Sequence, residues 1–156
     1  MSRIPKEIRC NPIGIIHSPY RDIKGMPLQP TGAKGIQGTI EIKKKYAKGL
    51  NDLEGFSHIV LICHFHRSKG YSLEVEPFLH ESLRGVFSTR APKTSKSHRH
   101  IGCQASQGRR LCTPIEDVDI LDGTPLLDIK PYVPAFDIRK TKTIGWLSKK
   151  IDKVVR

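Results

Sequence analysis

Short runs of apolar residues, separated by turn residues, recur along most of the chain. Residues 13–20 (IGIIHSPY) form a β-branched run that ends at a Ser-Pro pair, where proline removes a backbone donor and ends strand pairing. Residues 38–44 (GTIEIKK) alternate apolar and polar positions, which predicts a half-buried antiparallel strand. Residues 25–35, between these two strands, carry three Gly and two Pro, so we predict a loop there.

The longest apolar run covers residues 56–68 (FSHIVLICHFHRS). It predicts either a strand buried on both faces or a central strand of a barrel. Residues 46–55, which precede it, favour a short helix that ends at a glycine. Residues 83–92 (LRGVFSTRAP) predict a further strand and a turn, and residues 115–134 predict two strands joined by an Asp-Gly turn.

The predicted elements amount to about six or seven short strands and little helix, with no βαβ alternation and no internal repeat. We therefore expect an all-β fold, a single-sheeted β-barrel with short helical insertions and no Rossmann sheet. The barrel domain is expected at residues 10–137 and a basic C-terminal extension at residues 138–156. In this extension Trp146 and Leu147 favour a short helix or strand that packs, and its basic face is either solvated or in contact with RNA.

Composition supports a folded protein and narrows its partners. A chain of 156 residues with 37% hydrophobic and 27% charged residues is typical of one globular domain and not of a disordered chain. No apolar run approaches the roughly 18 residues of a membrane span, and the N-terminus lacks the apolar core of a signal peptide, so we expect a cytoplasmic location. The net charge of +12 favours RNA or DNA as a partner, with simple solubility as the alternative.

The Cys and His residues suggest a metal site only weakly. The four Cys have no CxxC spacing, and we interpret them as free thiols. His64 and His66 lie two apart on the predicted strand and could bind zinc, but packing by one and pocket lining by the other is the favoured interpretation. The zinc alternative would use a wider set of ligands: His64, His66, His98, His100, Cys103 and Cys112.

Several polar turns that follow buried strands carry candidate binding groups. The sequence has no GxGxxG after a strand, no Walker A motif and no GxSxG, so any cofactor must be held in another way. Arg90 could pair with a carboxylate or phosphate, and Asp119 and Asp122 could accept hydrogen bonds from ribose hydroxyls or an amino group. Gln29 and the His66-Arg67 pair occupy similar turns.

Taken together, these segments resemble the TsaA-like family, also called TrmO or YaeB. The motifs are IGIIHSPY, MPLQP, GLNDLEGFSHIVLICHFHRS, GVFSTRAP and DVDILDGTPLLDIKPYVPAFD, in that order, over about residues 13–137. The resemblance implies a β-barrel that dimerises and binds S-adenosylmethionine without a Rossmann fold. It also implies methylation of N6 of threonylcarbamoyl-adenosine next to the anticodon of certain tRNAs. The alternative is a basic barrel that binds RNA and S-adenosylmethionine without catalysis.

The resemblance also assigns residues. The implied cofactor contacts are Pro27, Leu28, Gln29, His66, Arg67, Arg90, Asp119, Ile120, Leu121 and Asp122. Leu28 replaces the family's more usual Arg, so a backbone contact is expected there. Methyl transfer from a sulfonium needs mainly alignment and exclusion of water, so no metal is expected. Asp128, Lys130 and Tyr132 of DIKPY are candidates for substrate positioning or proton transfer, with closure of the barrel edge as their structural alternative.

The segment 93–114 (KTSKSHRHIGCQASQGRRLCTP) departs from the family, which has RPNPIG followed by an apolar strand at this place. It has five basic residues, no acidic ones and little to bury. A one-base shift of a permitted coding sequence turns residues 93–113 into KRPNPIGILAVKLLKVEDSVR, which contains the motif and a strand pattern. We therefore interpret the segment as frameshifted, in the gene or in its sequencing, with a divergent loop as the alternative. As printed, residues 94–114 are expected to be irregular or poorly paired.

Overall fold

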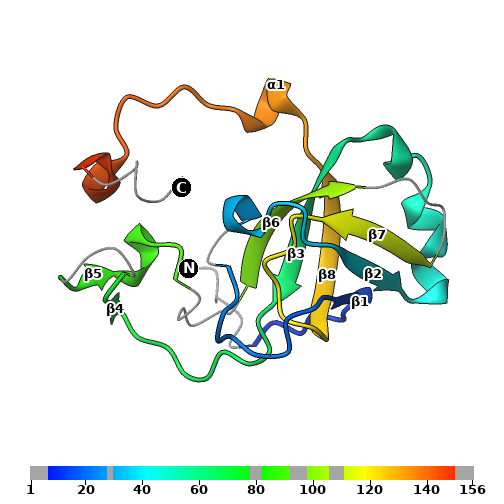
Figure 1. Ribbon diagram of the computed structural model, residues 1–156, viewed down its shortest axis with the longest axis horizontal. Helices are drawn as coiled ribbons and strands as arrows, with labels where there is room; N and C mark the ends of the chain where they lie inside the picture. Colours follow the sequence, from blue (N-terminus) through cyan, green and yellow to red (C-terminus); the bar gives the residue numbers. More distant parts are fainter. Residues whose placement is uncertain (1–6, 28–29, 78–81, 92–97, 106–110, 150–156) are drawn as a thin grey trace, which may run out of the picture.

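A computed structural model describes residues 7–27, 30–77, 82–91, 98–105 and 111–149. Six of its strands close into one antiparallel β-barrel, in the order β1, β2, β7, β6, β3, β8 (Figure 1). Their bounds are β1 Gly14–His17, β2 Gly38–Ile42, β3 His58–His64, β6 His98–Ala105, β7 Cys112–Glu116 and β8 Thr124–Pro131. The prediction of an all-β, single-sheeted barrel without a Rossmann sheet is confirmed.

Apolar side chains at alternate strand positions fill the barrel. In β3 every second residue is fully buried (Ile59, Leu61 and Cys63), and the residues between them are half-buried. Ile40 of β2 and Leu126 of β8 reach the same core. Of the two possibilities that the sequence left open, β3 is therefore the central barrel strand, with one face in the core.

The strands β1 and β2 approach closely at Gly14. A Cβ atom there would lie 2.2 Å from the carbonyl oxygen of Glu41, so any larger residue would push the two strands apart. β1 ends at His17, immediately before the Ser-Pro pair, as the sequence predicted.

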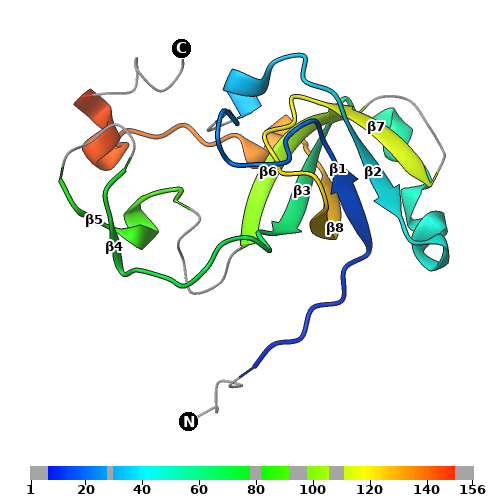
Figure 2. The same ribbon diagram turned by 60° about the horizontal axis from the view of Figure 1, so that its bottom comes forward.

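A small sheet lies beside the barrel and not in it (Figures 1 and 2). It consists of β4 (Glu74–Val75) and β5 (Arg84–Gly85), followed by the 3₁₀ helix η4 (Val86–Ser88). The strand predicted at residues 83–92 is thus wrong in extent, because only two residues pair. The C-terminal 3₁₀ helix η5 (Gly145–Lys149) packs on this sheet, where Trp146 Nε1 donates to the Ser88 carbonyl at 2.8 Å.

The remaining helical insertions are short. The helix predicted at residues 46–55 is two 3₁₀ helices, η2 (Lys44–Leu50) and η3 (Leu53–Gly55). Asp52 between them adopts a left-handed conformation with φ 65°, which interrupts a continuous helix. The others are η1 (Pro30–Ala33) and the single helical turn α1 (Pro134–Asp137).

The prediction that residues 94–114 are irregular is wrong for the part of this segment that the structure describes. β6 pairs with β3 at seven residue pairs, from His58↔Gln104 to His64↔His98. Backbone hydrogen bonds do not require a particular side chain, and the long strand β3 offers an edge that a neighbour must pair to close the barrel. Residues 92–97 and 106–110 of the predicted irregular segment lie outside the described residues.

Candidate functional site

One end of the barrel gathers the loops that carry most of the predicted cofactor residues. We call it the loop rim and define it by residues 18–27, 30–37, 65–67 and 117–123, which follow the ends of β1, β3 and β7. The pairings His17↔Thr39, Ile16↔Thr124 and Cys63↔Leu126 place these strand ends together. Segments far apart in the sequence therefore share one rim.

The loop between β7 and β8 is partly embedded in the core. Val118, Asp119 and Ile120 are 0 to 1% exposed, so they support the rim from below. Leu121 and Asp122 are half-buried, and Gly123 has φ 75°, which an Asp-Gly turn requires. The Asp-Gly turn is thus confirmed, but the strand predicted from residue 115 up to this turn is wrong in extent, because β7 ends at Glu116 and residues 117–121 form a loop.

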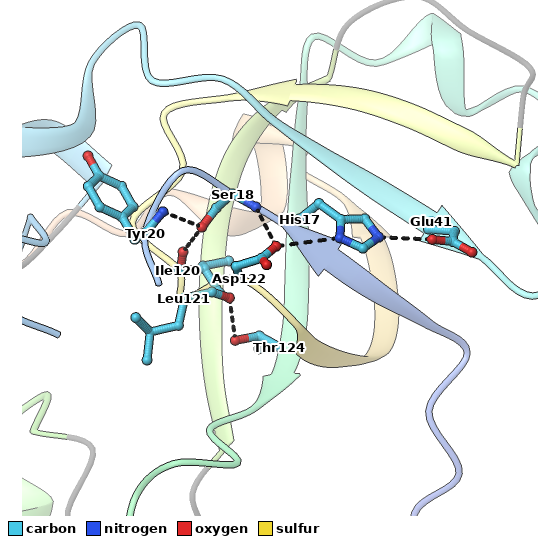
Figure 3. Close-up of polar contacts among 8 residues, drawn as sticks. All are labelled: His17, Ser18, Tyr20, Glu41, Ile120, Leu121, Asp122 and Thr124. Atoms are coloured by element: carbon cyan, nitrogen blue, oxygen red, sulfur yellow. Dashed lines mark hydrogen bonds and ion pairs between the residues drawn. The ribbon is translucent and has the colours of Figure 1, made fainter. Parts of the chain in front are cut away.

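Hydrogen bonds fasten this loop to the segment after β1 (Figure 3). The Asp122 amide donates to the Tyr20 carbonyl at 2.7 Å, and the Ser18 hydroxyl donates to the Ile120 carbonyl at 2.5 Å. The Ser18 amide donates to Asp122 Oδ1 at 3.2 Å. Thr124 Oγ1 donates to the Leu121 carbonyl at 2.7 Å and closes the turn from the β8 side. The loop therefore has a fixed backbone before any ligand binds.

His17 joins the Asp122 side chain to β2. Its Nδ1 lies 3.4 Å from Asp122 Oδ1, and its Nε2 lies 2.9 Å from Glu41 Oε2. The hydrogen bond to Glu41 raises the pKa of His17, burial opposes this, and Asp122 raises it further. The ring therefore favours its charged form.

His66 and Arg67 occupy the turn after β3. Arg67 Nη1 donates to the Arg21 carbonyl at 3.0 Å, which ties this turn to the loop after β1. Burial lowers the pKa of His66, assisted by the charges of Arg67 and His64. At neutral pH His66 is therefore a neutral ring that can accept a hydrogen bond.

The other predicted cofactor residues are less completely described. Pro27 is half-buried at the start of the predicted loop, whereas Leu28 and Gln29 lie outside the described residues. Arg90 is exposed in the turn after η4, which Thr89 shapes by donating to the Val86 carbonyl at 2.8 Å. This turn leads toward β6, whose first residue pairs with the last residue of β3 at the loop rim.

The three candidates for substrate positioning lie toward the opposite end of the barrel. Asp128 Oδ2 and Lys130 Nζ are 2.6 Å apart, and Asp128 lines a cavity of about 330 Å³ with Tyr46 of η2. The Tyr132 amide donates to the carbonyl of His58, at the start of β3. Eight residues of strand separate Tyr132 from the start of β8, which corresponds to about 26 Å. One chain therefore does not bring these residues to the loop rim.

The zinc alternative finds no support in the described part of the chain. β3 ends at His64, so His66 lies in a turn and the two rings do not share a strand face. No three His, Cys, Asp or Glu side chains among the described residues are placed to hold a metal ion. Cys10, Cys63 and Cys112 form no disulfide within the described ranges, and nothing is described of the side chains of residues 98–105.

Sequence reasoning missed His17, Ser18 and Glu41 as part of the site. The motif IGIIHSPY was used only to end a strand. His17 and Glu41 both fall on outward positions of neighbouring antiparallel strands, as diagonal neighbours, and this relation follows only from the register of β1 and β2.

Comparison with known proteins decides the family. The family model described as tRNA-methyltransferase O N-terminal domain matches residues 15–138. The chain belongs to the TrmO family. The predicted resemblance to this family is thereby confirmed.

TrmO relatives occur in archaea, bacteria and mammals. A Pyrococcus abyssi protein named "Probable S-adenosyl-L-methionine-binding protein" is 50% identical over 151 residues, which cover 97% of this chain and 82% of that protein. The Mus musculus tRNA (adenine(37)-N6)-methyltransferase is 32% identical, over 81% of this chain and 31% of that protein. A crystal structure of TrmO from Pseudomonas aeruginosa matches with a TM-score of 0.74 and 30% identity, over 90% of this chain and 62% of that one. The chain thus spans less than two thirds of the length of the Mus musculus enzyme and of the Pseudomonas aeruginosa structure.

Proposed function

We propose that the chain is an S-adenosylmethionine-dependent tRNA methyltransferase that methylates N6 of threonylcarbamoyl-adenosine next to the anticodon. The observation that carries the proposal is the gathering of the family's cofactor motifs at one rim of the barrel, together with membership of the TrmO family. The net charge of +12 suits a polyanionic substrate such as tRNA. No helix within the described ranges has the length and apolarity to span a membrane, and a tRNA substrate favours the cytoplasm.

The candidate cofactor residues fit the chemical groups of this cofactor. Arg67 and Arg90 are cations that can pair with the cofactor's carboxylate, although Arg67 also holds the Arg21 carbonyl. The Asp122 carboxylate is 40% exposed and can accept from a ribose hydroxyl or an ammonium group. Pro27, Leu28, Gln29, His66, Asp119, Ile120 and Leu121 complete the proposed set.

When bound, S-adenosylmethionine supplies an electrophilic methyl group on a positively charged sulfur. The chain's part is then to hold donor and acceptor in line, to exclude water and to receive the proton that the acceptor nitrogen loses. The acceptor nitrogen belongs to a urea-like group, so a carboxylate such as Asp128, or Tyr132, is a sufficient base. Lys130 orients the Asp128 carboxylate, since Lys130 Nζ lies 2.6 Å from Asp128 Oδ2.

We further propose that the active form is a homodimer. Tyr132 lies about a strand length from the loop rim of its own chain, and Asp128 lies about half a strand length from it. In a homodimer a second copy would bring these residues to the loop rim of its partner. The catalytic and cofactor-binding halves of each site would then come from different subunits.

The first experiment measures binding and transfer separately. Labelled S-adenosylmethionine is offered to the purified chain with tRNA that does or does not carry the threonylcarbamoyl group. Asp122→Ala is expected to weaken cofactor binding about tenfold or more, the size of one lost hydrogen bond to a charged group. Asp128→Ala is expected to leave cofactor binding unchanged and to slow transfer, and Glu74→Ala on the small sheet is the control. Binding without transfer by the natural protein would favour the non-catalytic alternative.

The second experiment tests the shared site. The mixing is done at a cofactor concentration well below the dissociation constant of the Asp122→Ala chain, where each variant alone shows little transfer. If the subunits complement each other, equal mixing of the Asp122→Ala and Asp128→Ala chains then raises the activity to about a quarter of the natural value, because half of the dimers are mixed and each contains one intact site. No recovery after subunit exchange, shown by mass spectrometry to be complete, would contradict a shared site.

A further inference from the structure

His17 touches two carboxylates on two different elements. Figure 3 shows its ring between Glu41 of β2 and Asp122 of the loop before β8. The Ser18 amide donates to the same Asp122 oxygen that faces His17 Nδ1. One short segment, His17-Ser18, thus supplies both groups that fix the Asp122 side chain on this side of the loop.

Only the protonated ring can serve both contacts. A neutral imidazole has one N–H donor, whereas an imidazolium has two, and here both ring nitrogens face carboxylate oxygens that can only accept. The contact to Glu41 is the shorter, at 2.9 Å against 3.4 Å for Asp122. Loss of the proton therefore leaves the N–H with Glu41 and turns a lone pair of Nδ1 toward Asp122. Deprotonation releases Asp122 and not Glu41.

We propose that His17 is a positioning residue whose protonated ring clamps Asp122, and with it residues 120–123, in the conformation that binds the cofactor. This inference rests on the proposed function, since it assumes that Asp122 contacts the cofactor. It adds a role for a residue outside the cofactor set, and it makes cofactor affinity depend on pH near neutrality.

The surroundings of His17 determine the direction of this dependence. β2 contributes Glu41, the loop before β8 contributes Asp122, and the intermediate residues Pro125 and Leu127 of β8 do not titrate. Because the two carboxylates raise the pKa of His17, the clamp is complete at and below the ordinary histidine value of about 6.5. It is lost as the pH rises through the raised value, on the alkaline side of 6.5.

The test is a titration of cofactor affinity by calorimetry with S-adenosylmethionine and the full chain, between about pH 6 and pH 9. The natural chain is expected to bind about tenfold more weakly at the alkaline end, the size of one lost hydrogen bond to a charged group. Glu41→Gln should move the fall to lower pH, because the ring loses its strongest partner. His17→Gln should flatten the profile, because its amide does not titrate in this range, and Glu74→Gln is the matched carboxylate control.

A second readout needs no cofactor. In the ligand-free chain, exchange of the Asp122 and Gly123 amides, bonded to the Tyr20 and Ile16 carbonyls, should accelerate over the same pH range more than that of the Lys43 amide, which bonds to Ile13. The clamp is overturned if Glu41→Gln does not shift the pH dependence of cofactor affinity. It is also overturned if the Asp122 and Gly123 amides keep their protection from exchange as the pH rises. If the natural chain binds no cofactor at any pH, the proposed function fails, and amide exchange still decides the clamp.

Discussion

β3 and β6 are neighbours in the barrel and pair along seven residue pairs, but their sequences have little in common. β3 reads HIVLICH, with an apolar centre that predicts a strand by itself, and β6 reads HRHIGCQA. β3 becomes a strand because its side chains fill the core, whereas β6 is a strand because the backbone of β3 needs a partner. Pairing in a closed barrel can therefore be imposed by neighbours, while packing cannot.

The register of β3 and β6 identifies the positions at which their sequences differ most. Positions 99, 101 and 103 of β6 stand opposite Cys63, Leu61 and Ile59, the three fully buried residues of β3. An arginine thus occupies the position opposite Cys63, on the face of the sheet where the core lies. The frame-restored segment replaces it with glycine, keeps an aliphatic residue at position 101 and supplies two new ones at positions 103 and 105.

The largest effect is expected from replacing residues 93–113 with KRPNPIGILAVKLLKVEDSVR. This change includes Arg99→Gly, Cys103→Val and Ala105→Leu. Each newly buried aliphatic side chain stabilises by about 1.5–3 kcal/mol, so the free energy of unfolding should rise by roughly 5 kcal/mol and the melting temperature by about 10–20 °C. Thermal and urea unfolding of the two chains measures this.

Peptide mass spectrometry of the naturally expressed protein is the control for the first prediction, since it reads which segment the natural chain carries. Equal or lower stability of the frame-restored chain would mean that β6 as printed is already well packed, and the contrast with β3 would disappear.

A smaller effect is expected within β3 itself. Leu61→Ala removes a fully buried side chain and should lower the free energy of unfolding by about 2–5 kcal/mol. Ile62→Ala, on the half-buried face of the same strand, is the matched control and should cost less. Equal losses in urea unfolding would show that both faces of β3 are packed alike.

The smallest effect is expected from a single exchange in β6. If position 99 faces the core as its register partner Cys63 does, Arg99→Val should stabilise the chain by about 1–3 kcal/mol, the range for removing a polar group from apolar surroundings. His100→Val, opposite the half-buried Ile62, is the control and should change stability less. The reverse order would mean that the faces of β6 are exchanged relative to β3.

The sequence predicted those parts of the fold that depend on local patterns. Alternation and β-branched runs located β1, β2, β3 and β8, and Ser18 marked the end of β1. Prediction from local patterns failed at β6, which is a strand because of its place next to β3 in the barrel. It also failed at residues 83–92, where the apolar pattern covers only two paired residues of a separate small sheet. Local pattern carries no information about which strand a segment will meet.

The site was predicted as motifs and not as an arrangement. Family motifs pointed to Asp122 and Arg67, which the structure places at one rim. The motifs gave no information about the distance between these residues and Asp128. The role of His17 could not be predicted, because its meaning depends on Glu41, 24 residues later, and on Asp122, 105 residues later. Charged pairs across strands become visible only when the register is known.

The loop rim joins segments that follow β1, β3 and β7, which are distant along the chain. A ligand held by all of them acts as a non-covalent cross-link, because the strands cannot separate without releasing it. At a concentration of 100 times its dissociation constant, such a ligand would add about 2.7 kcal/mol to the free energy of unfolding. The cofactor would then serve this protein as a folding partner as well as a reagent.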